Sequence, residues 1–258
     1  MDLGRYLEGF WRPDRSRVDN LVLLETVDST NLLAREISSE CLAAGNPPPA
    51  TLVVALEQSG GRGRRGRRWS SPRAKGVYVS WILPLPDRQQ LVALPLLVAV
   101  GLADGLGGML DRDCRLKWPN DLVVGGRKIG GILIESLAMG EHGAVAIIGF
   151  GVNHSQTADE LPVEAATSIE LETGEAPALP ETTGRLVAAV AAELRQIGDL
   201  ETAVERYRQR SVHNRGDHIR CRTPAGLVEG TFAGFDERGF LRLESKSGDQ
   251  LVVAGDLS

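Results

Sequence analysis

The chain has 258 residues, of which 42% are hydrophobic and 24% charged, and its formal net charge is -5. This length suits a full hydrophobic core in one large domain, or in one large and one small domain. No apolar stretch approaches the ~18 residues of a membrane span, the N-terminus lacks a signal-peptide pattern, and the acidic balance disfavours general nucleic-acid binding.

Apolar periodicity and turn residues predict alternating strands and helices after a charged segment over 1–17, which we interpret as a tail. In chain order we expect a strand over 21–25, a helix over 30–44, strands over 51–56 and 76–83, a helix over 91–110, strands over 115–118, 122–124, 128–135 and 144–150, and a helix over 186–210. Ser29 is typical of a helix N-cap, and Gly198-Asp199 predicts a break in the last helix. Gly125-Gly126 favours a tight hairpin.

The pattern changes after residue 211, where helical periodicity stops. Short β-like runs alternate with turns at 224–226, 236–239 and 246–249. So small an all-β module is weakly stable alone, so we expect it to pack on the main domain. The fold class predicted is α+β, with a mixed sheet and flanking helices over 18–210 and a small β domain over 211–258.

The most unusual segment is the arginine loop, Gly61 to Trp69, in which five of the seven residues over 62–68 are arginine. So much positive charge in an acidic chain indicates an anionic partner, because guanidinium groups suit phosphate and carboxylate oxygens. Three glycines fit G-x-G-x-x-G, but the charged and turn-like residues that follow do not start the helix that a dinucleotide fingerprint needs. A solvated basic loop or a nucleic-acid patch remains open from this segment alone.

Four other segments carry polar groups at the ends of predicted elements. They are Asp28-Ser29-Thr30-Asn31, Lys117-Trp118-Pro119-Asn120-Asp121, Lys128 to Glu135 and Gly149-Phe150-Gly151-Val152-Asn153. The first combines polar side chains with the free N–H groups of a helix start. Adjacent glycines at Gly130 and Gly131 predict a close approach by backbone or ligand. Taken singly, each segment also fits an ordinary cap, turn or bulge.

The joint order of these motifs resembles the biotin protein ligases, also called biotin–[acetyl-CoA-carboxylase] ligases. That family carries Ser-Thr-Asn, then Gln before G-R-G-R-x-G-R-x-W, then K-W-P-N-D, K-x-x-G-I-L-x-E and G-x-N, and all five occur here between Ser29 and Asn153. The resemblance implies a class II synthetase-like catalytic domain and an SH3-like β-barrel over 211–258. It also implies ATP-dependent formation of biotinyl-5′-AMP, release of pyrophosphate, and transfer of biotin to a lysine of a carrier protein.

The resemblance also implies residue roles. Biotin binding falls to Ser29, Thr30, Asn31, Gln58, Arg62, Gly63, Arg64, Lys117, Gly130 and Gly131. ATP binding falls to Arg64, Arg67, Trp69, Asn120, Asp121, Lys128 and Asn153. Catalytic roles fall to Arg62, Arg64, Lys117 and Lys128, with Lys117 beside the acyl-phosphate linkage.

We expect ATP, Mg²⁺ and biotin as ligands, with Mg²⁺ held mainly through the ATP phosphates rather than by a protein cage. The partner implied is a biotin carboxyl carrier protein of acetyl-CoA carboxylase, without nucleic acid or membrane, and a homodimer is plausible. The 17 N-terminal residues are too few for the helix-turn-helix domain of some relatives, so no repressor role is expected. Cys41, Cys114 and Cys221 form no C-x-x-C pair, which favours a reducing, cytoplasmic location.

Two other functions compete with this interpretation. A lipoate ligase would not need the Ser29-Thr30-Asn31 and Gln58 set, because lipoate has no ureido head. A biotin-binding protein without catalysis would not need a phosphate-directed arginine cluster or the lysines Lys117 and Lys128. Biotin affinity without ATP-dependent pyrophosphate release would favour the biotin-binding protein without catalysis.

Overall fold

The computed structural model describes residues 3–4, 6, 18–162, 165–245 and 248–257, so the predicted tail over 1–17 lies largely outside the described residues. Within that segment Tyr6 is buried, and its hydroxyl lies 2.6 Å from Thr183 Oγ1. In the described part of the chain, no helix combines the length and apolar character needed to span a bilayer.

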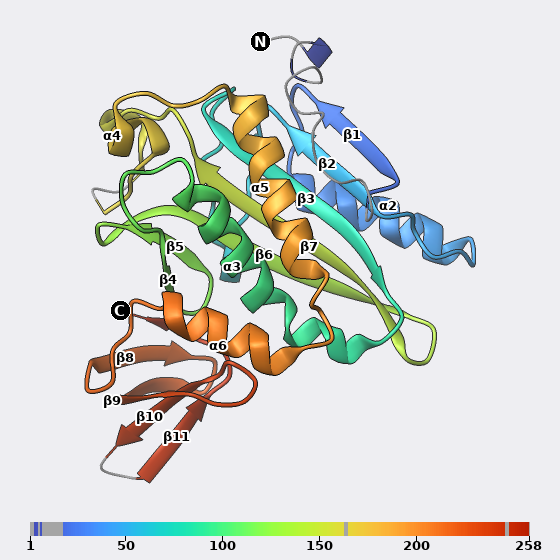
Figure 1. Cartoon of the computed structure of the whole chain (residues 1–258). Helices are drawn as coiled ribbons and strands as arrows, with labels where there is room; N and C mark the ends of the chain where they lie inside the picture. The colour runs from blue at the N-terminus through green and yellow to red at the C-terminus, as the bar shows by residue number, and fades with distance from the viewer. Residues whose placement is uncertain (1–2, 5, 7–17, 163–164, 246–247, 258) are drawn as a thin grey trace.

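A seven-stranded mixed sheet forms the centre of the molecule (Figure 1). Its strands are β1 (Asn20–Leu24), β2 (Thr51–Ala55), β3 (Gly76–Leu85), β4 (Arg115–Lys117), β5 (Asp121–Val124), β6 (Arg127–Met139) and β7 (Gly143–Asn153). Their order is β1-β2-β3-β7-β6-β5-β4, with β1 parallel to β2 and the other neighbours antiparallel. The left-handed backbone of Gly125 and Gly126 makes the tight turn between β5 and β6, as the sequence predicts.

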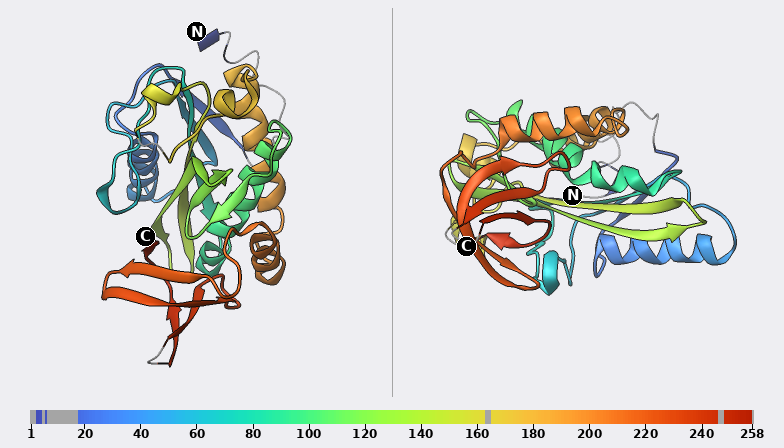
Figure 2. Two further views of the ribbon diagram at one scale, coloured as in Figure 1. Left: turned by 90° about the vertical axis from the view of Figure 1, so that its left-hand side faces the viewer. Right: turned by 90° about the horizontal axis from the view of Figure 1, so that it is seen from below.

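Helices cover both faces of this sheet (Figure 2). The α3 helix (Leu94–Gly107) and α5 helix (Leu179–Leu194) bury one face in the main core, and α6 (Leu200–Arg210) packs beside α3. The α2 helix (Thr30–Ala43) covers only part of the opposite face, over a small cluster that includes Val53, Ile82 and Ile147. The predicted mixed sheet with flanking helices is thereby confirmed.

The helix boundaries differ from the sequence prediction in two places. The predicted helix over 91–110 divides into the 3-10 helix η2 (Arg88–Val92) and α3, whose first turn contains Pro95. The α5 helix begins at Leu179 rather than near 186, because Pro180 occupies a first-turn position where its missing N–H is tolerated. The remaining short elements are η1 (Arg64–Gly66), η3 (Ala158–Glu160) and α4 (Ile169–Thr173).

A second sheet lies at the C-terminal end of the chain. It consists of β8 (His218–Thr223), β9 (Gly226–Phe235), β10 (Leu241–Ser245), β11 (Gly248–Val252) and β12 (Asp256–Leu257), in the order β11-β10-β9-β8-β12. All its neighbouring pairs are antiparallel, and the pairs among the described residues leave the sheet open. The predicted all-β segment is present, while closure into an SH3-like barrel stays a prediction.

The C-terminal sheet is attached to the main sheet at the β4 edge. Val212 N donates to Leu116 O at 2.9 Å, and Trp118 N donates to His213 Nε2 at 3.2 Å. Phe232 and Phe235 extend the main hydrophobic core into the C-terminal sheet. A continuous core of this kind stabilises a sheet that would be marginal alone.

The interface histidine predicts a pH dependence of stability. Burial, and then the charge of Lys117, lower the pKa of His213 from 6.5 to about 4, while Asp217 opposes the shift. Between these values the unfolded chain binds more protons at this ring than the folded protein, so the free energy of unfolding should rise with pH from about 4 to 6.5 and level off above.

Urea unfolding across this pH range would measure the effect in the wild type and in His213→Gln, whose amide oxygen can still accept from Trp118 N. The slope of unfolding free energy against pH should differ between the two proteins by nearly the amount expected for the binding of one proton. Identical slopes in the two proteins would show that His213 does not titrate in this way.

Candidate functional site

The site lies on the α2 side of the main sheet, where β6 and β7 carry glycines at neighbouring positions. Gly131 pairs with Gly151, and Gly149 is the next residue on the same face of β7. A Cβ atom on Gly151 would lie 2.5 Å from Trp69 Nε1, and a Cβ on Gly149 would overlap the Asn31 amide. The glycines therefore leave bare backbone on which other groups lie directly.

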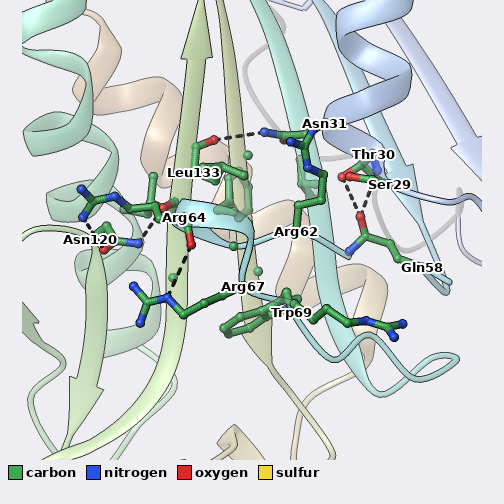
Figure 3. Close-up of a pocket in the computed structure, with 18 of the residues that line it drawn as sticks. Ser29, Thr30, Asn31, Gln58, Arg62, Arg64, Arg67, Trp69, Asn120 and Leu133 are labelled. Atoms are coloured by element: carbon green, nitrogen blue, oxygen red, sulfur yellow. Dashed lines mark hydrogen bonds between the residues drawn. The ribbon is translucent and has the colours of Figure 1, made fainter. Parts of the chain in front are cut away.

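A cavity of about 120 Å³ lies over this bare backbone (Figure 3). Its walls come from the start of α2, from the arginine loop and from β5 to β7. It brings together most of the predicted site residues, namely Ser29, Thr30, Asn31, Gln58, Arg62, Gly63, Arg64, Arg67, Trp69, Asn120, Lys128 and Gly131.

One end of the cavity is neutral, polar and buried. Ser29 is the N-cap residue of α2, but its side chain makes no capping hydrogen bond. Instead Gln58 Oε1 accepts from Thr30 N at 2.9 Å and lies 3.2 Å from Thr30 Oγ1. Gln58 Nε2 donates to Ser71 Oγ at 2.8 Å, which fixes the orientation of the amide. This end thus offers oriented donors and acceptors with little access to water.

Two further residues hold this polar end in place: Ser80, which the sequence did not single out, and Glu135, the last residue of the segment from Lys128. The Ser80 hydroxyl, on β3, lies 2.5 Å from Asn31 Oδ1 and 2.8 Å from Thr30 Oγ1. Asn31 Nδ2 donates to Glu135 Oε2 at 3.0 Å and to Leu133 O at 3.3 Å. Strand alternation could have placed Ser80 on this face, but its contact with α2 depends on tertiary packing.

The opposite end of the cavity is cationic. Lys128 Nζ lies 5.5 Å from the centroid of the Trp69 ring and donates to Asp121 Oδ1 at 2.5 Å. Arg64 Nη1 donates to Asn120 Oδ1 at 3.2 Å. Burial lowers the pKa of Arg64 and is the largest influence on it. The negative charge of Asp256 opposes this shift. Among the described residues, no group of three or more His, Cys, Asp and Glu side chains is placed to hold a metal ion.

The arginine loop is tied to the C-terminal sheet by one carboxylate that the sequence did not single out. Asp256 Oδ1 accepts from Arg67 Nη2 at 2.7 Å, and Asp256 Oδ2 accepts from Arg65 Nη1 at 3.2 Å. Arg64 Nη1 lies 4.0 Å from the same carboxylate and 3.3 Å from Gly255 O. No local sequence pattern signals this contact, because nearly two hundred residues separate its partners.

Four predicted site residues do not line the cavity. Lys117 faces a separate hollow beside His213 and the C-terminal sheet. Gly130 faces the other side of β6, where a Cβ would meet Leu122. Asp121 contributes indirectly through Lys128, and Asn153 lies in an adjoining pocket that shares Trp69 and Lys128 with the cavity.

This arrangement suits an elongated ligand with two different ends. A small neutral head with several hydrogen-bonding atoms fits the Thr30 and Gln58 end. Anionic groups fit the opposite end, where Arg64, Arg67 and Lys128 concentrate positive charge in a half-buried space. The adjoining pocket behind Trp69 offers an aromatic face for a flat second ligand.

Comparisons with known proteins agree with this geometry. The model of the biotin/lipoate A/B protein ligase family matches residues 23–153, a segment that contains most of the cavity. The bifunctional ligase/repressor BirA of Bacillus subtilis is 31% identical over 92% of this chain and 73% of its own length. A biotin--[acetyl-CoA-carboxylase] ligase of Paracoccus denitrificans is 34% identical over 91% of this chain and 98% of its own length.

Solved structures show the same similarity in three dimensions. A biotin protein ligase from Aquifex aeolicus in complex with biotin and ATP has a TM-score of 0.76 at 26% identity, covering 93% of this chain and 98% of that one. A biotin protein ligase from Leishmania major in complex with biotinyl-5-AMP has a TM-score of 0.56, also at 26% identity, covering 92% and 99%.

The contact between the arginine loop and Asp256 predicts that Asp256→Asn loosens the loop. Solvent-accessible ion pairs each contribute about 0.2–1 kcal/mol, so losing the pairs with Arg65 and Arg67 should raise the open population about 2- to 30-fold. Trypsin would report the change, because it cleaves after arginine and residues 62–68 are rich in it.

Asp249→Asn is the matched control, since Asp249 pairs with Arg242 at 3.7 Å on the same sheet, away from the loop. We expect wild-type cleavage for the control. Equal cleavage of Asp256→Asn and the wild type would mean that other contacts hold the loop.

Proposed function

The chain belongs to the biotin/lipoate A/B protein ligase family, and we propose that it is an ATP-dependent biotin protein ligase. It activates biotin to biotinyl-5′-AMP with release of pyrophosphate, and then transfers biotin to a lysine of a carrier protein. The observation that carries this proposal is the two-ended cavity, which joins a neutral hydrogen-bonding end to a cationic end over a bare sheet.

We place the ureido head of biotin at the neutral end. A urea group has two N–H donors and one carbonyl acceptor, and Ser29, Thr30 and Gln58 supply polar atoms of both kinds there. The lipoate ring has no such polar atoms, so it would make no hydrogen bonds at this end, whereas the urea group of biotin can make several. The polar end therefore favours biotin over lipoate.

The cationic end fits the first reaction step. The biotin carboxylate must attack the α-phosphorus of ATP, although both groups are negative. Arg64, Arg67 and Lys128 offset this repulsion and stabilise the charge that develops as the bond to pyrophosphate breaks. Mg²⁺ carried with the nucleotide would add further neutralisation of the departing pyrophosphate to that of Arg64, Arg67 and Lys128.

The pocket behind Trp69 is the place we propose for the nucleotide base. It lies next to the cavity, shares Trp69 and Lys128 with it, and contains the Asn153 amide. The indole provides an aromatic face for a base to stack on. This position would leave the phosphates at Lys128 and the arginine loop.

Lys128 replaces Lys117 as the lysine that we propose beside the acyl-phosphate linkage. Lys128 Nζ reaches the cavity over Trp69 and is oriented by Asp121. Lys117, three residues from Asn120 in sequence, instead faces the hollow that contains His213. Its separation from the cavity supports a role outside the first step.

In the second step, the carrier lysine amine attacks the acyl carbon of biotinyl-5′-AMP. A C–N bond forms, the C–O bond to the phosphate breaks, AMP leaves with the electron pair, and the proton on nitrogen passes to solvent. Relatives named biotin--[acetyl-CoA-carboxylase] ligase support a carrier protein of that carboxylase as the acceptor. We also propose a cytoplasmic location, a catalytic part over 18–210, and a C-terminal part over 211–258 that closes into an SH3-like barrel.

Intact-mass spectrometry of a biotin carrier domain incubated with this protein, biotin and MgATP tests the proposal. ATP-dependent addition of one biotin is expected, with no addition when lipoate replaces biotin. Biotin binding without any addition would favour the non-catalytic alternative.

The same assay separates the two lysines. Lys128→Ala should slow adenylate formation about 10²- to 10³-fold, as expected for loss of a charge at the reacting phosphate. Lys117→Ala should leave it within about threefold of the wild type. A comparable loss of adenylate formation in both variants would mean that Lys117 also acts in the first step.

A third substitution tests the neutral end. Gln58→Met keeps the length of the side chain but removes the acceptor for Thr30 N, so KM for biotin should rise about 10- to 100-fold. KM for ATP at saturating biotin should change little. Glu57→Gln, at the neighbouring half-buried position that does not line the cavity, is the control. An equal rise in both KM values would indicate general damage to the site.

A further inference from the structure

A second groove opens from the cationic end of the cavity, between the main sheet and the C-terminal sheet. It has a volume of about 240 Å³ and shares four residues with the cavity, namely Arg64, Asn120, Ile132 and Leu133. Its outer walls carry the apolar side chains Val92, Leu96, Pro119, Ile134, Phe240 and Val253. We call it the interface groove.

The interface groove exposes apolar side chains from two separate parts of the chain. Val92, at the end of η2, is 36% exposed, and Val253, just after β11, is 57% exposed. They are two of the five large hydrophobic residues exposed among the described positions. Apolar walls on both sides of a groove are typical of a surface that binds another protein.

The cationic end has two openings, and their chemistry differs. The pocket behind Trp69 combines an aromatic face with the Asn153 amide, which suits a flat base. The interface groove is lined mainly by aliphatic groups, and besides the shared Arg64 it has a second arginine, Arg238. Arg238 forms no ion pair with any described residue, so its charge is available to a partner. A triphosphate would gain little from these aliphatic walls.

We propose that the interface groove receives the carrier-protein segment that bears the acceptor lysine. This inference rests on the proposed ligase function. The lysine side chain would pass Arg64 and Asn120 toward the acyl carbon, while neighbouring apolar side chains of the carrier contact Val92 and Val253. Arg238 would pair with a carboxylate of the carrier near that lysine.

The test separates docking from chemistry. Val92→Glu and Val253→Glu place a charge on exposed apolar walls and should not disturb the core. Each should raise KM for the carrier domain at least tenfold, while biotin-dependent exchange of pyrophosphate into ATP stays within about twofold of the wild type. Reaction of the enzyme-bound adenylate with hydroxylamine, a small nucleophile that needs no docking surface, should also stay unchanged.

Leu251→Glu is the matched control. Leu251 belongs to the same C-terminal sheet and is 52% exposed, but it does not line the interface groove. We expect wild-type KM for the carrier in this variant. A similar rise in all three variants would mean that added charge, not the groove, weakens docking.

Other outcomes would overturn the inference. Unchanged KM for the carrier in Val92→Glu and Val253→Glu would place docking elsewhere. If the two variants lost pyrophosphate exchange as strongly as they lost carrier binding, the groove would be assigned to the nucleotide. If they changed the molecular mass of the protein in solution, the groove would be assigned to a second copy of the chain. Absence of exchange in the wild type would instead reject the ligase function itself.

Discussion

The whole site depends on the absence of side chains along one face of the central sheet. At Gly131, Gly149 and Gly151 the strands β6 and β7 present only backbone, so Trp69 and Asn31 lie directly on the sheet. Any larger residue at Gly149 or Gly151 would collide with one of them. The opposite face of the same strands carries large apolar groups and belongs to the main core. Alternate residues of the same strands therefore have different roles: those on one face pack into the rigid core, and those on the other leave space for the cavity.

Charge imposes the second constraint on the site. Five arginines within residues 62–68 repel one another, and the fold offsets this repulsion with carboxylates from distant parts of the chain. Asp256 contacts Arg65 and Arg67, and Glu135 lies 3.9 Å from Arg62. These pairs are partly exposed to solvent, so each is modest in strength and can be exchanged for a ligand oxygen. A loop held in this way is ordered enough to form a wall and still able to release its arginines to phosphate.

The sequence predicts those parts of the structure that depend on local pattern. Strand alternation and the Gly125-Gly126 turn place β3, β5 and β6 correctly, and the arginine loop and Ser29-Thr30-Asn31 do meet at one cavity. Features that depend on tertiary packing were not predictable. The contact of Ser80 with α2, and of Asp256 with the loop, joins segments that no local pattern relates. The orientation of Lys117 and Lys128 follows from β-strand register and a bulge between β5 and β6, which the motifs alone do not specify.

The C-terminal sheet contributes to the cationic end in two ways, which explains why its attachment matters for function. Through Asp256 it holds the arginine loop, and through Val253 it forms one wall of the interface groove. The main sheet supplies the other wall, so the width of the groove depends on how the two sheets pack. His213, Phe232 and Phe235 set that packing from within a shared core. A movement of the C-terminal sheet that opened the groove would therefore also pull Asp256 away from Arg67, so the width of the groove and the position of the arginine loop are coupled.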